Sequence, residues 1–480
     1  MKSSKLLSVL QSFSQVEMTR FDKYVHSPYF HVHADTIRLF ELLKRYYPDF
    51  KEKKVRQEAI YKALFPGQSF KKARLYTLKG YLLKLSYEFL AEEASSKQFS
   101  IKNRISTMRG LADRTLDTII PRILNDSQAE LEAYPYRETH YYYESFRLAE
   151  FTTDYQLGRQ NRSKEAVLQP VVDALDRYYL AQKLKYACAM INHQQIIAVE
   201  YQYPFLEEVI AHCANIDWEE SPMIGIYYLA LMMQKEAEGE AFYRKLIVML
   251  DQYQPLLPAG EVLSLYSLAI NFCNRQYKQG RKEFLREMFD IFLQMLRQDL
   301  LFTNSATAII YFKNLVTLGL KLKEYQWTED FIINQKDNLA ETHRESTYNY
   351  SLALLRFQQK EYRKCTRHLL QVEFIDDFNR LNYYILLLKT YYESEEIESL
   401  LSMCNTAITY IRRNKSLAAR NKNAYVNFVK YIRTLARINF NGSKTPPDLK
   451  QQIEESALLV ERNWLLEKSM ILQPQTITHE

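Results

Sequence analysis

The stretch ALLRFQQKEYRKCTRHLLQV, residues 353–372, can be laid over LKTYYESEEIESLLSMCNTA, residues 388–407, with an offset of 35 residues. Tyr362 of the first stretch then meets Ile397 of the second. A weaker copy, LGLKLKEYQWTEDFII, begins at Leu318. A spacing of about 34 residues, with a helix, a turn and a second helix in each unit, is typical of helical-repeat proteins. The sequence therefore predicts stacked helical pairs in this region.

The rest of the chain has the composition of an all-α protein. Of its 480 residues only 10 are glycine and 13 are proline, and no proline stands between Pro258 and Pro446. Tight hairpins and nucleotide-binding α/β folds need glycine-rich turns. Apolar residues instead recur at helical spacing from residue 101 to residue 439. We therefore predict the all-α class.

The region 314–410 resembles degenerate tetratricopeptide repeats. The likeness rests on the apolar and small pair Leu352 and Ala353, on Tyr362 after a short turn, and on Cys365 where the repeat usually has alanine. It implies a right-handed α-α superhelix, that is, a tetratricopeptide-like solenoid with a concave surface.

The sequence also departs from that family. The early tryptophan, the repeat glycines and the closing proline are missing, although Leu318-Gly319 matches the Leu-Gly pair of the repeat. Over its whole length the chain is similar to a group of uncharacterised bacterial proteins with phrases like FDKYVHSPYF and LGLKLKEYQW. That likeness implies no activity and no functional residues.

Four segments are predicted along the chain, namely a small helical N-terminal module at 1–95, the helical-repeat region at 96–440, a linker with a C-terminal capping helix at 441–470, and a tail at 471–480. The stretch DLKQQIEESALLVERNWLLEKSMIL, from Asp448, has the pattern of one amphipathic helix. Repeat arrays need such a cap, because the last unit otherwise exposes its apolar face.

Local signals define the first helices. Ser14 and Glu17 have the spacing of a capping box at a helix start. Pro28 disfavours helical backbone before it, so this helix should end near His26. Asp35 is the expected N-cap of the next helix.

Three histidines, His26, His31 and His33, lie within FDKYVHSPYFHVH. A metal site is one interpretation, but no carboxylate or cysteine stands at a convincing ligand spacing, and we favour a connector between helices. His140 and Glu144 form a second i, i+4 pair, which is more typical of a surface hydrogen bond. HExxH, GxSxG, Walker and GxGxxG motifs are missing from the sequence. We expect no cofactor and no metal.

The five cysteines stand apart from one another, without a CxxC pair. We expect reduced thiols in a cytoplasmic protein. The sequence holds no run of about 18 apolar residues, so we expect no membrane span.

One charge feature exceeds the background. Between residues 399 and 447 there is no Asp or Glu, whereas the whole chain carries a net charge of only +7. A basic stripe can bind phosphates, an acidic peptide or an anionic surface, or it can be a solvated face. The candidate partner-binding residues are Arg412, Arg413, Lys415, Arg420, Lys422, Lys430, Arg433 and Arg437; Lys444 is the ninth basic residue of the stretch.

A second basic region lies at residues 55–90. A short helix, a turn at Phe65-Pro66-Gly67 and a longer helix beginning near Lys71 and Lys72 have the order of a helix-turn-helix DNA reader. A helical pair with a solvated basic face has the same pattern.

The sequence favours a non-catalytic interaction scaffold or adaptor that binds a peptide or protein partner on a helical-repeat surface. Acidic peptides and proteins are among the partners expected. The alternative is a nucleic-acid-associated regulator that uses the basic helices at 55–90 or 412–437. A third hypothesis, an enzyme with a site built from dispersed residues, would need a deep pocket with a cluster of perturbed titratable groups.

Overall fold

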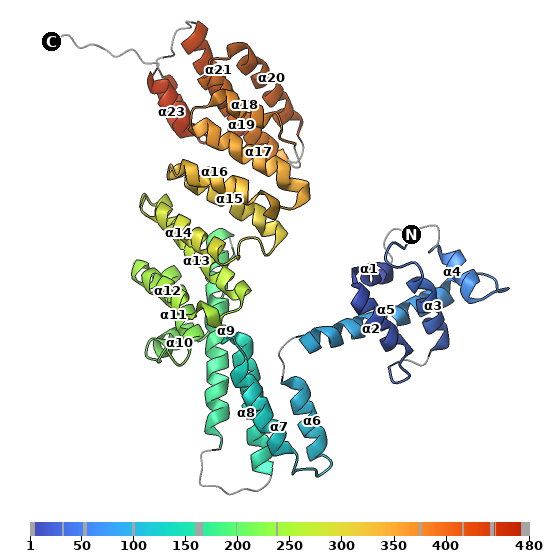
Figure 1. Cartoon of the computed structure of the whole chain (residues 1–480). Helices are drawn as coiled ribbons and strands as arrows, with labels where there is room; N and C mark the ends of the chain where they lie inside the picture. Colours follow the sequence, from blue (N-terminus) through green and yellow to red (C-terminus); the bar gives the residue numbers. More distant parts are fainter. Residues whose placement is uncertain are drawn as a thin grey trace. The chain divides into compact units, whose positions relative to one another are not determined.

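The computed structural model describes residues 5–30, 33–50, 55–97, 101–158, 167–197, 199–236, 239–373, 377–414, 417–441, 446 and 448–471. Every regular element in these residues is helical, which confirms the predicted all-α class. The chain divides into two compact units, residues 1–182 and residues 183–480 (Figure 1). The predicted segment boundaries near residues 95, 440 and 470 stay predictions.

The first part of unit 1 is built around one long helix. Its helices are α1 (Lys5–Ser12), α2 (Gln15–His26), α3 (Ala34–Lys44), α4 (Gln57–Leu64) and α5 (Lys72–Lys97). The first four all contact α5. The apolar stripe of α5 has the helical spacing of a core face, and its members are at most 3% exposed: Leu75, Leu78, Leu82, Leu85 and Phe89.

The predicted capping box at the start of α2 is confirmed. The Ser14 hydroxyl accepts a hydrogen bond from the Glu17 N–H at 3.2 Å, and the Glu17 carboxylate accepts one from the Ser14 N–H at 2.9 Å. The helix ends at His26, as Pro28 predicts. The N-cap expected at Asp35 is wrong, because α3 already begins one residue earlier. Asp35 instead lies in the first turn, where its charge favours the helix dipole and pairs with Arg74 at 2.9 Å.

The second part of unit 1 has a core of its own. It contains α6 (Lys102–Ala112), α7 (Ile120–Ala133) and α8 (Thr139–Gly158). The buried cluster that holds these helices together consists of Ile101, Ile105, Met108, Ile120, Leu131, Leu148 and Phe151. The next helix, α9 (Gln169–Ile196), runs across the boundary between the units.

Unit 2 is a succession of helices that pack in chain order (Figure 1). They are α10 (Leu206–Cys213), α11 (Pro222–Lys235), α12 (Glu240–Tyr253), α13 (Ala259–Lys278), α14 (Phe284–Arg297), α15 (Ser305–Lys321), α16 (Tyr325–Asn334), α17 (Glu341–Gln358), α18 (Tyr362–Leu369), α19 (Asp377–Glu393), α20 (Ile397–Arg413), α21 (Ala419–Asn441), α22 (Leu449–Glu455) and α23 (Arg462–Ile471). Two 3-10 turns, Gln254–Leu256 and Lys336–Asn338, follow α12 and α16.

The same turn ends the first helix of four consecutive pairs, α13–α14, α15–α16, α17–α18 and α19–α20. A residue in the left-handed conformation follows each of these first helices: Gly280 (φ 97°), Lys323 (φ 61°), Lys360 (φ 62°) and Glu395 (φ 59°). The N–H of the next residue donates to a carbonyl five residues back, as in Glu324 to Gly319 and Glu396 to Tyr391, both at 2.9 Å. This is the Schellman motif, which satisfies the free carbonyls of a helix end. The left-handed residues are 43, 37 and 35 residues apart, so the sequence offset of 35 corresponds to a repeated turn.

Close packing within one pair depends on a glycine. A Cβ atom at Gly319 of α15 would lie 2.2 Å from the hydroxyl oxygen of Thr328 on α16. Thr328 is fully buried, and its hydroxyl donates to the Glu324 carbonyl at 2.7 Å. The Leu-Gly pair noted in the sequence therefore stands where two helices of one pair touch.

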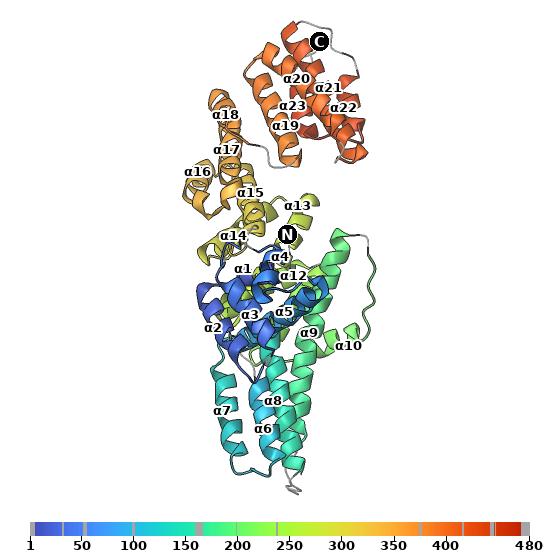
Figure 2. The same cartoon turned by 90° about the vertical axis from the view of Figure 1, so that its right-hand side faces the viewer.

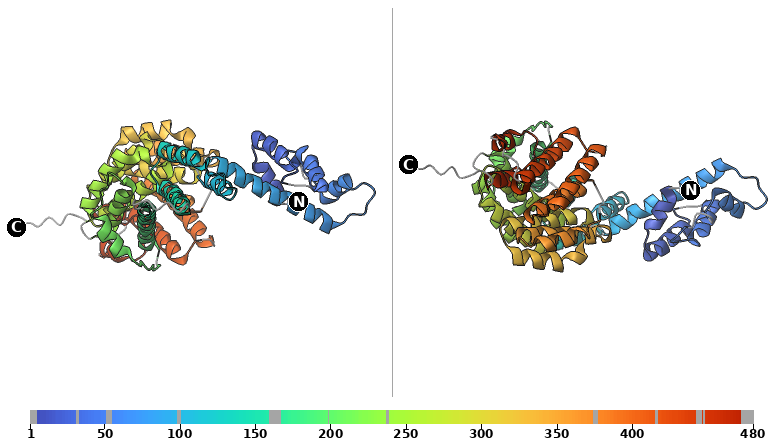
Figure 3. Two further views of the ribbon diagram at one scale, coloured as in Figure 1. Left: turned by 90° about the horizontal axis from the view of Figure 1, so that it is seen from below. Right: turned by 90° about the horizontal axis from the view of Figure 1, so that it is seen from above.

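The C-terminal part differs from the single amphipathic helix that the sequence predicts. It forms two helices, α22 and α23, separated by residues 456–461. Glu461 has a positive φ of 54°, and the Leu458 carbonyl accepts a hydrogen bond from the Asn427 amide of α21 at 3.0 Å. A continuous helix could not make this tertiary contact, because its carbonyls are used within the helix. The helices α19 to α23 are seen from two further directions in Figures 2 and 3.

Candidate functional site

The repeated turn gives the first helices a common register. We count residues back from the left-handed residue that follows each helix. Positions minus nine, minus six and minus two then lie on one side, because they are three, four and seven residues apart. We call this side the recurrent face. Its members are Asn271, Asn274 and Lys278 on α13, Asn314, Thr317 and Lys321 on α15, Ser351, Leu354 and Gln358 on α17, and Leu386, Lys389 and Glu393 on α19.

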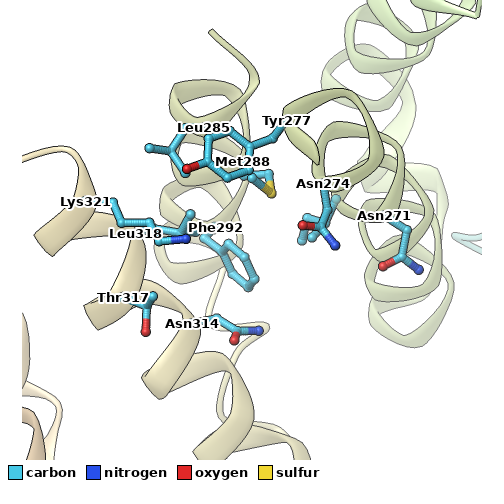
Figure 4. A pocket seen from close by; sticks show the side chains of 11 residues that line it. Asn271, Asn274, Tyr277, Leu285, Met288, Phe292, Asn314, Thr317, Leu318 and Lys321 are labelled. Atoms are coloured by element: carbon cyan, nitrogen blue, oxygen red, sulfur yellow. The ribbon is translucent and has the colours of Figure 1, made fainter. Parts of the chain in front are cut away.

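A cavity of about 240 Å³ lies between α13, α14 and α15 (Figure 4). Five of the six recurrent-face residues of α13 and α15 line it, and α14 completes it. The full lining is Ile270, Asn271, Asn274, Tyr277, Leu285, Met288, Phe292, Asn314, Thr317, Leu318 and Lys321.

The cavity combines an apolar wall with amide groups. Leu285, Met288 and Phe292 of α14 are buried side chains. Asn271 is engaged, since its amide donates to the Asn192 side chain at 3.0 Å. The amides of Asn274 and Asn314 make no hydrogen bond to the part of the chain that the structure describes. Each offers two donors and an acceptor to a bound group.

Lys321 is the only charged residue of the lining. Its Nζ lies 5.2 Å from the centre of the Tyr277 ring, which is a cation–π distance. With one cation and two available amides, the cavity suits a polar or anionic group of a protein segment together with an apolar side chain. Its titratable lining residues are Tyr277 and Lys321 alone, which is not the cluster that the enzyme hypothesis would need.

The recurrent face of α19 carries a ligand-like element, the helix α23. The Lys389 ammonium lies 2.7 Å from the Glu461 carboxylate, and the Glu393 carboxylate lies 2.8 Å from the Lys468 ammonium. The Trp464 indole N–H also donates to Glu393, at 2.9 Å. The residue at minus two of α19 therefore binds α23, and the residue at minus six binds Glu461 directly before it.

Aromatic packing completes this contact. The Trp464 ring meets the Tyr392 ring edge to face, with centroids 5.3 Å apart, and lies 6.3 Å from the Phe428 ring of α21. Burial raises the pKa of Tyr392 to about 12. Burial lowers the pKa of Lys468, but the hydrogen bonds and charges of Glu393 and Glu467 together raise it by more, so the net shift is upward. Lys468 is therefore held as a cation.

The basic candidates of 399–447 are spread over α20 and α21. Arg412 and Arg413 end α20, and Arg420 and Lys422 begin α21, so these four lie at one end of an antiparallel pair. Arg437 lies about 22 Å along α21 from Lys422. Exposed candidates are Arg412, Arg413, Arg420, Lys430 and Arg437, and half-buried ones are Lys422 and Arg433; Lys415 and Lys444 lie outside the described residues.

Arg433 differs from the other basic candidates. Its guanidinium donates to the Asn405 side chain of α20 at 2.8 Å. It also lies beside the Cys404 thiol, whose pKa burial raises and Arg433 partly lowers. Arg433 thus joins α20 to α21. Among the described residues no acidic side chain pairs with Arg412, Arg413, Arg420 or Lys422.

The basic residues of the predicted helix-turn-helix are partly engaged within unit 1. Arg74 pairs with Asp35 and stacks on the Phe65 ring, 3.8 Å from its centroid. Burial lowers the pKa of Lys79. Lys71 and Lys72 are exposed. The elements α4 and α5 have the predicted order, but only part of the predicted basic face is available to phosphates.

The histidine segment acts as a connector where it is described. His26 is bonded to the Asp22 carbonyl at 2.8 Å and to the Glu41 carboxylate at 3.2 Å. His31 lies outside the described residues. Glu144 is buried and accepts from the Ile101 N–H at 3.1 Å, so it anchors the start of α6. Within the described ranges no group of three or more His, Cys, Asp or Glu side chains could hold a metal ion.

Sequence reasoning missed the cavity and the contact of α23 with α19. Asn274 and Asn314 are 40 residues apart, and only the repeated turn shows that they share a face. The signal available in the sequence was Asn and Lys at seven-residue spacing before the first two of the four turns, Asn271 with Lys278 and Asn314 with Lys321. The three tryptophans, of which Trp464 is one, were a second unused signal.

The chain matches no protein-family model. Among curated proteins no relative matches it either. None of the helices in the described residues is long and apolar enough to cross a membrane.

Proposed function

We propose that the chain is a non-catalytic interaction scaffold or adaptor that binds a segment of a protein partner on the recurrent face of its first helices. One observation supports this proposal above the others. The recurrent face of α19 holds α23 through Glu393 and the preceding Glu461 through Lys389, and five recurrent-face residues of α13 and α15 line an open cavity. Because the recurrent face binds a helical segment at α19, we infer that it can also bind a partner segment at α13 and α15.

We further infer a tetratricopeptide-like right-handed superhelix for the repeat region. The repeated Schellman turn and the spacings of 37 and 35 residues support it. The wider spacing of 43 residues before Lys323 is a departure from that family. In such an array the first helices line one continuous surface, which suits extended or helical partner segments.

Blocking the cavity tests the proposal. Asn314 is an exposed rim residue, so Asn314→Trp should fill the entrance without disturbing the core. Intact wild-type and variant chains would be used to capture proteins from the cells that make the chain. We expect a defined partner that the wild type retains and Asn314→Trp loses. Gln326→Trp on the exposed side of α16 is the matched control and should retain it.

The same capture separates the scaffold from the alternative, a nucleic-acid-associated regulator. The four basic residues at the joined ends of α20 and α21 support that alternative, because no described acid neutralises them. Phosphate contacts release counterions, so binding to nucleic acid weakens steeply with salt. Partners that survive nuclease and high salt favour the scaffold, and loss of all partners under both treatments would favour the regulator.

A further inference from the structure

The helix α23 packs against α21 and α22, and its outer side is exposed. Its inward residues Leu465 and Ser469 are at most 3% exposed, whereas Met470 and Ile471 are 51% and 69% exposed. It has 10 residues. Isolated helices of that length are marginal in water. The helical state of α23 therefore depends on the surface that it occupies.

The contact has the pattern of specific recognition. Trp464 and Lys468 stand four residues apart, so they project from one side of α23, and Glu461 directly precedes the helix with a positive φ of 54°. Glu461 meets Lys389, Lys468 meets Glu393, and the indole lies between the two ion pairs with its N–H on Glu393. Opposite charges at the two ends fix the direction in which the helix lies on α19.

Much of the binding strength should reside in few groups. Lys389, Glu393 and Lys468 are 12%, 17% and 14% exposed, so these charges are largely removed from water. Such a charge is costly when its partner is taken away. Trp464 is half-buried and its N–H is satisfied, and tryptophans that combine an apolar ring with a bonded N–H are common energetic centres of interfaces.

We propose that α23 is an exchangeable internal ligand of the face formed by α19, α21 and α22. The external partner that this face fits is a short amphipathic helix of another protein. That helix carries an acidic residue, a tryptophan three residues later and a basic residue four residues after that. The inference rests on the proposed scaffold function but concerns a different place from the cavity at α13–α15.

The test uses the full chain and a fluorescent peptide that copies residues 456–471. Reversing both charges of α23 in the chain, by Glu461→Lys with Lys468→Glu, should open its amides to hydrogen exchange. The opened chain should then bind the wild-type peptide about tenfold or more tightly than the wild-type chain does, because the internal competitor is at high effective concentration. A peptide with Trp464→Ala should not bind the opened chain.

Two further variants keep the test decisive. Lys389→Glu with Glu393→Lys, added to the reversed chain, should restore the pairs and the protection of α23. Lys450→Glu with Glu454→Lys, which reverses an exposed pair on α22, is the matched control and should change neither readout. If the reversed chain also loses protection in α19, the milder Lys468→Gln takes its place.

Two results would overturn the inference. One is a reversed chain whose α23 stays protected. The other is a reversed chain whose α23 opens while α19 stays folded and no peptide binds, which would make α23 a structural cap. Neither result touches the scaffold proposal, since capture of a partner through Asn314 is measured on α15.

Discussion

Lys321 and Glu393 occupy the same position in their helices, two residues before the left-handed residue that ends each one, and they carry opposite charges. Glu393 uses its charge to hold Lys468 of α23. Lys321 projects into the cavity and lies over the Tyr277 ring, with no acid in the lining. The two sites thus share a backbone register and differ in the sign of the group that they accept. A segment that binds the cavity should present a carboxylate where α23 presents an ammonium.

This relationship predicts the selectivity of the cavity. Peptides of 15 residues selected from a random displayed library on the intact wild-type chain should be enriched in Asp and Glu. On Lys321→Glu the enrichment should change to Lys and Arg, because like charges are disfavoured in a contact shielded from water. Lys323→Glu, two residues further on and outside the lining, should select the same acidic peptides as the wild type. If the peptides selected on the wild type and on Lys321→Glu show the same enrichment in charged residues, the prediction is contradicted.

The contact between Gly319 and Thr328 predicts a stability change. Gly319→Ala would place a methyl group 2.2 Å from the Thr328 hydroxyl oxygen in a buried position. Overpacking of this kind costs about 1–3 kcal/mol of unfolding free energy. Urea unfolding followed by circular dichroism would measure it.

Two variants show whether the clash is the cause. Thr328→Ala removes the opposing hydroxyl, so the double variant should be less destabilised than the two single changes together predict. Gly260→Ala is the matched control in α13, because a Cβ there meets nothing within 4 Å. It should leave the stability unchanged or raise it by up to about 1 kcal/mol. If Gly260→Ala lowered the unfolding free energy as much as Gly319→Ala, the cause would be a general effect of the methyl group and not the clash with Thr328.

These results show which features a sequence encodes locally. The start of α2 at Ser14 and Glu17 and its end before Pro28 depend on neighbours within a few residues, so the sequence predicted both. The buried stripe of α5 was predicted from the helical spacing of its apolar residues alone. The break before α23 and the shared face of Asn274 and Asn314 depend on tertiary contacts and on turn register, which composition and spacing do not reveal. Spacing also does not reveal that Arg433 is bonded to Asn405 across two helices, and the partner-binding role of the basic stretch stays a prediction.

His26 predicts a pH dependence of stability. The hydrogen bond to the Asp22 carbonyl, and then that to Glu41, raise its pKa above the usual 6.5. A folded-state pKa above the unfolded one stabilises the fold fully below pH 6.5 and loses this contribution as the pH rises through the folded value. The stability advantage of the wild type over His26→Gln should therefore shrink as the pH is raised from below 6.5. Glu41→Gln should weaken this dependence, and parallel stability curves for wild type and His26→Gln would contradict it.

The eight candidate basic residues should separate into a structural one and surface ones. Arg433→Ala removes the donor to Asn405 and should cost about 1 kcal/mol of unfolding free energy. Arg437→Ala, one turn further along α21 and exposed, should change stability by less than about 0.5 kcal/mol. Binding of an acidic partner or of DNA, if measured in the same variants, should respond to neither as strongly as to reversal of Arg412, Arg413 and Arg420. Equal stability losses for Arg433→Ala and Arg437→Ala would show that the bond to Asn405 does not join α20 to α21.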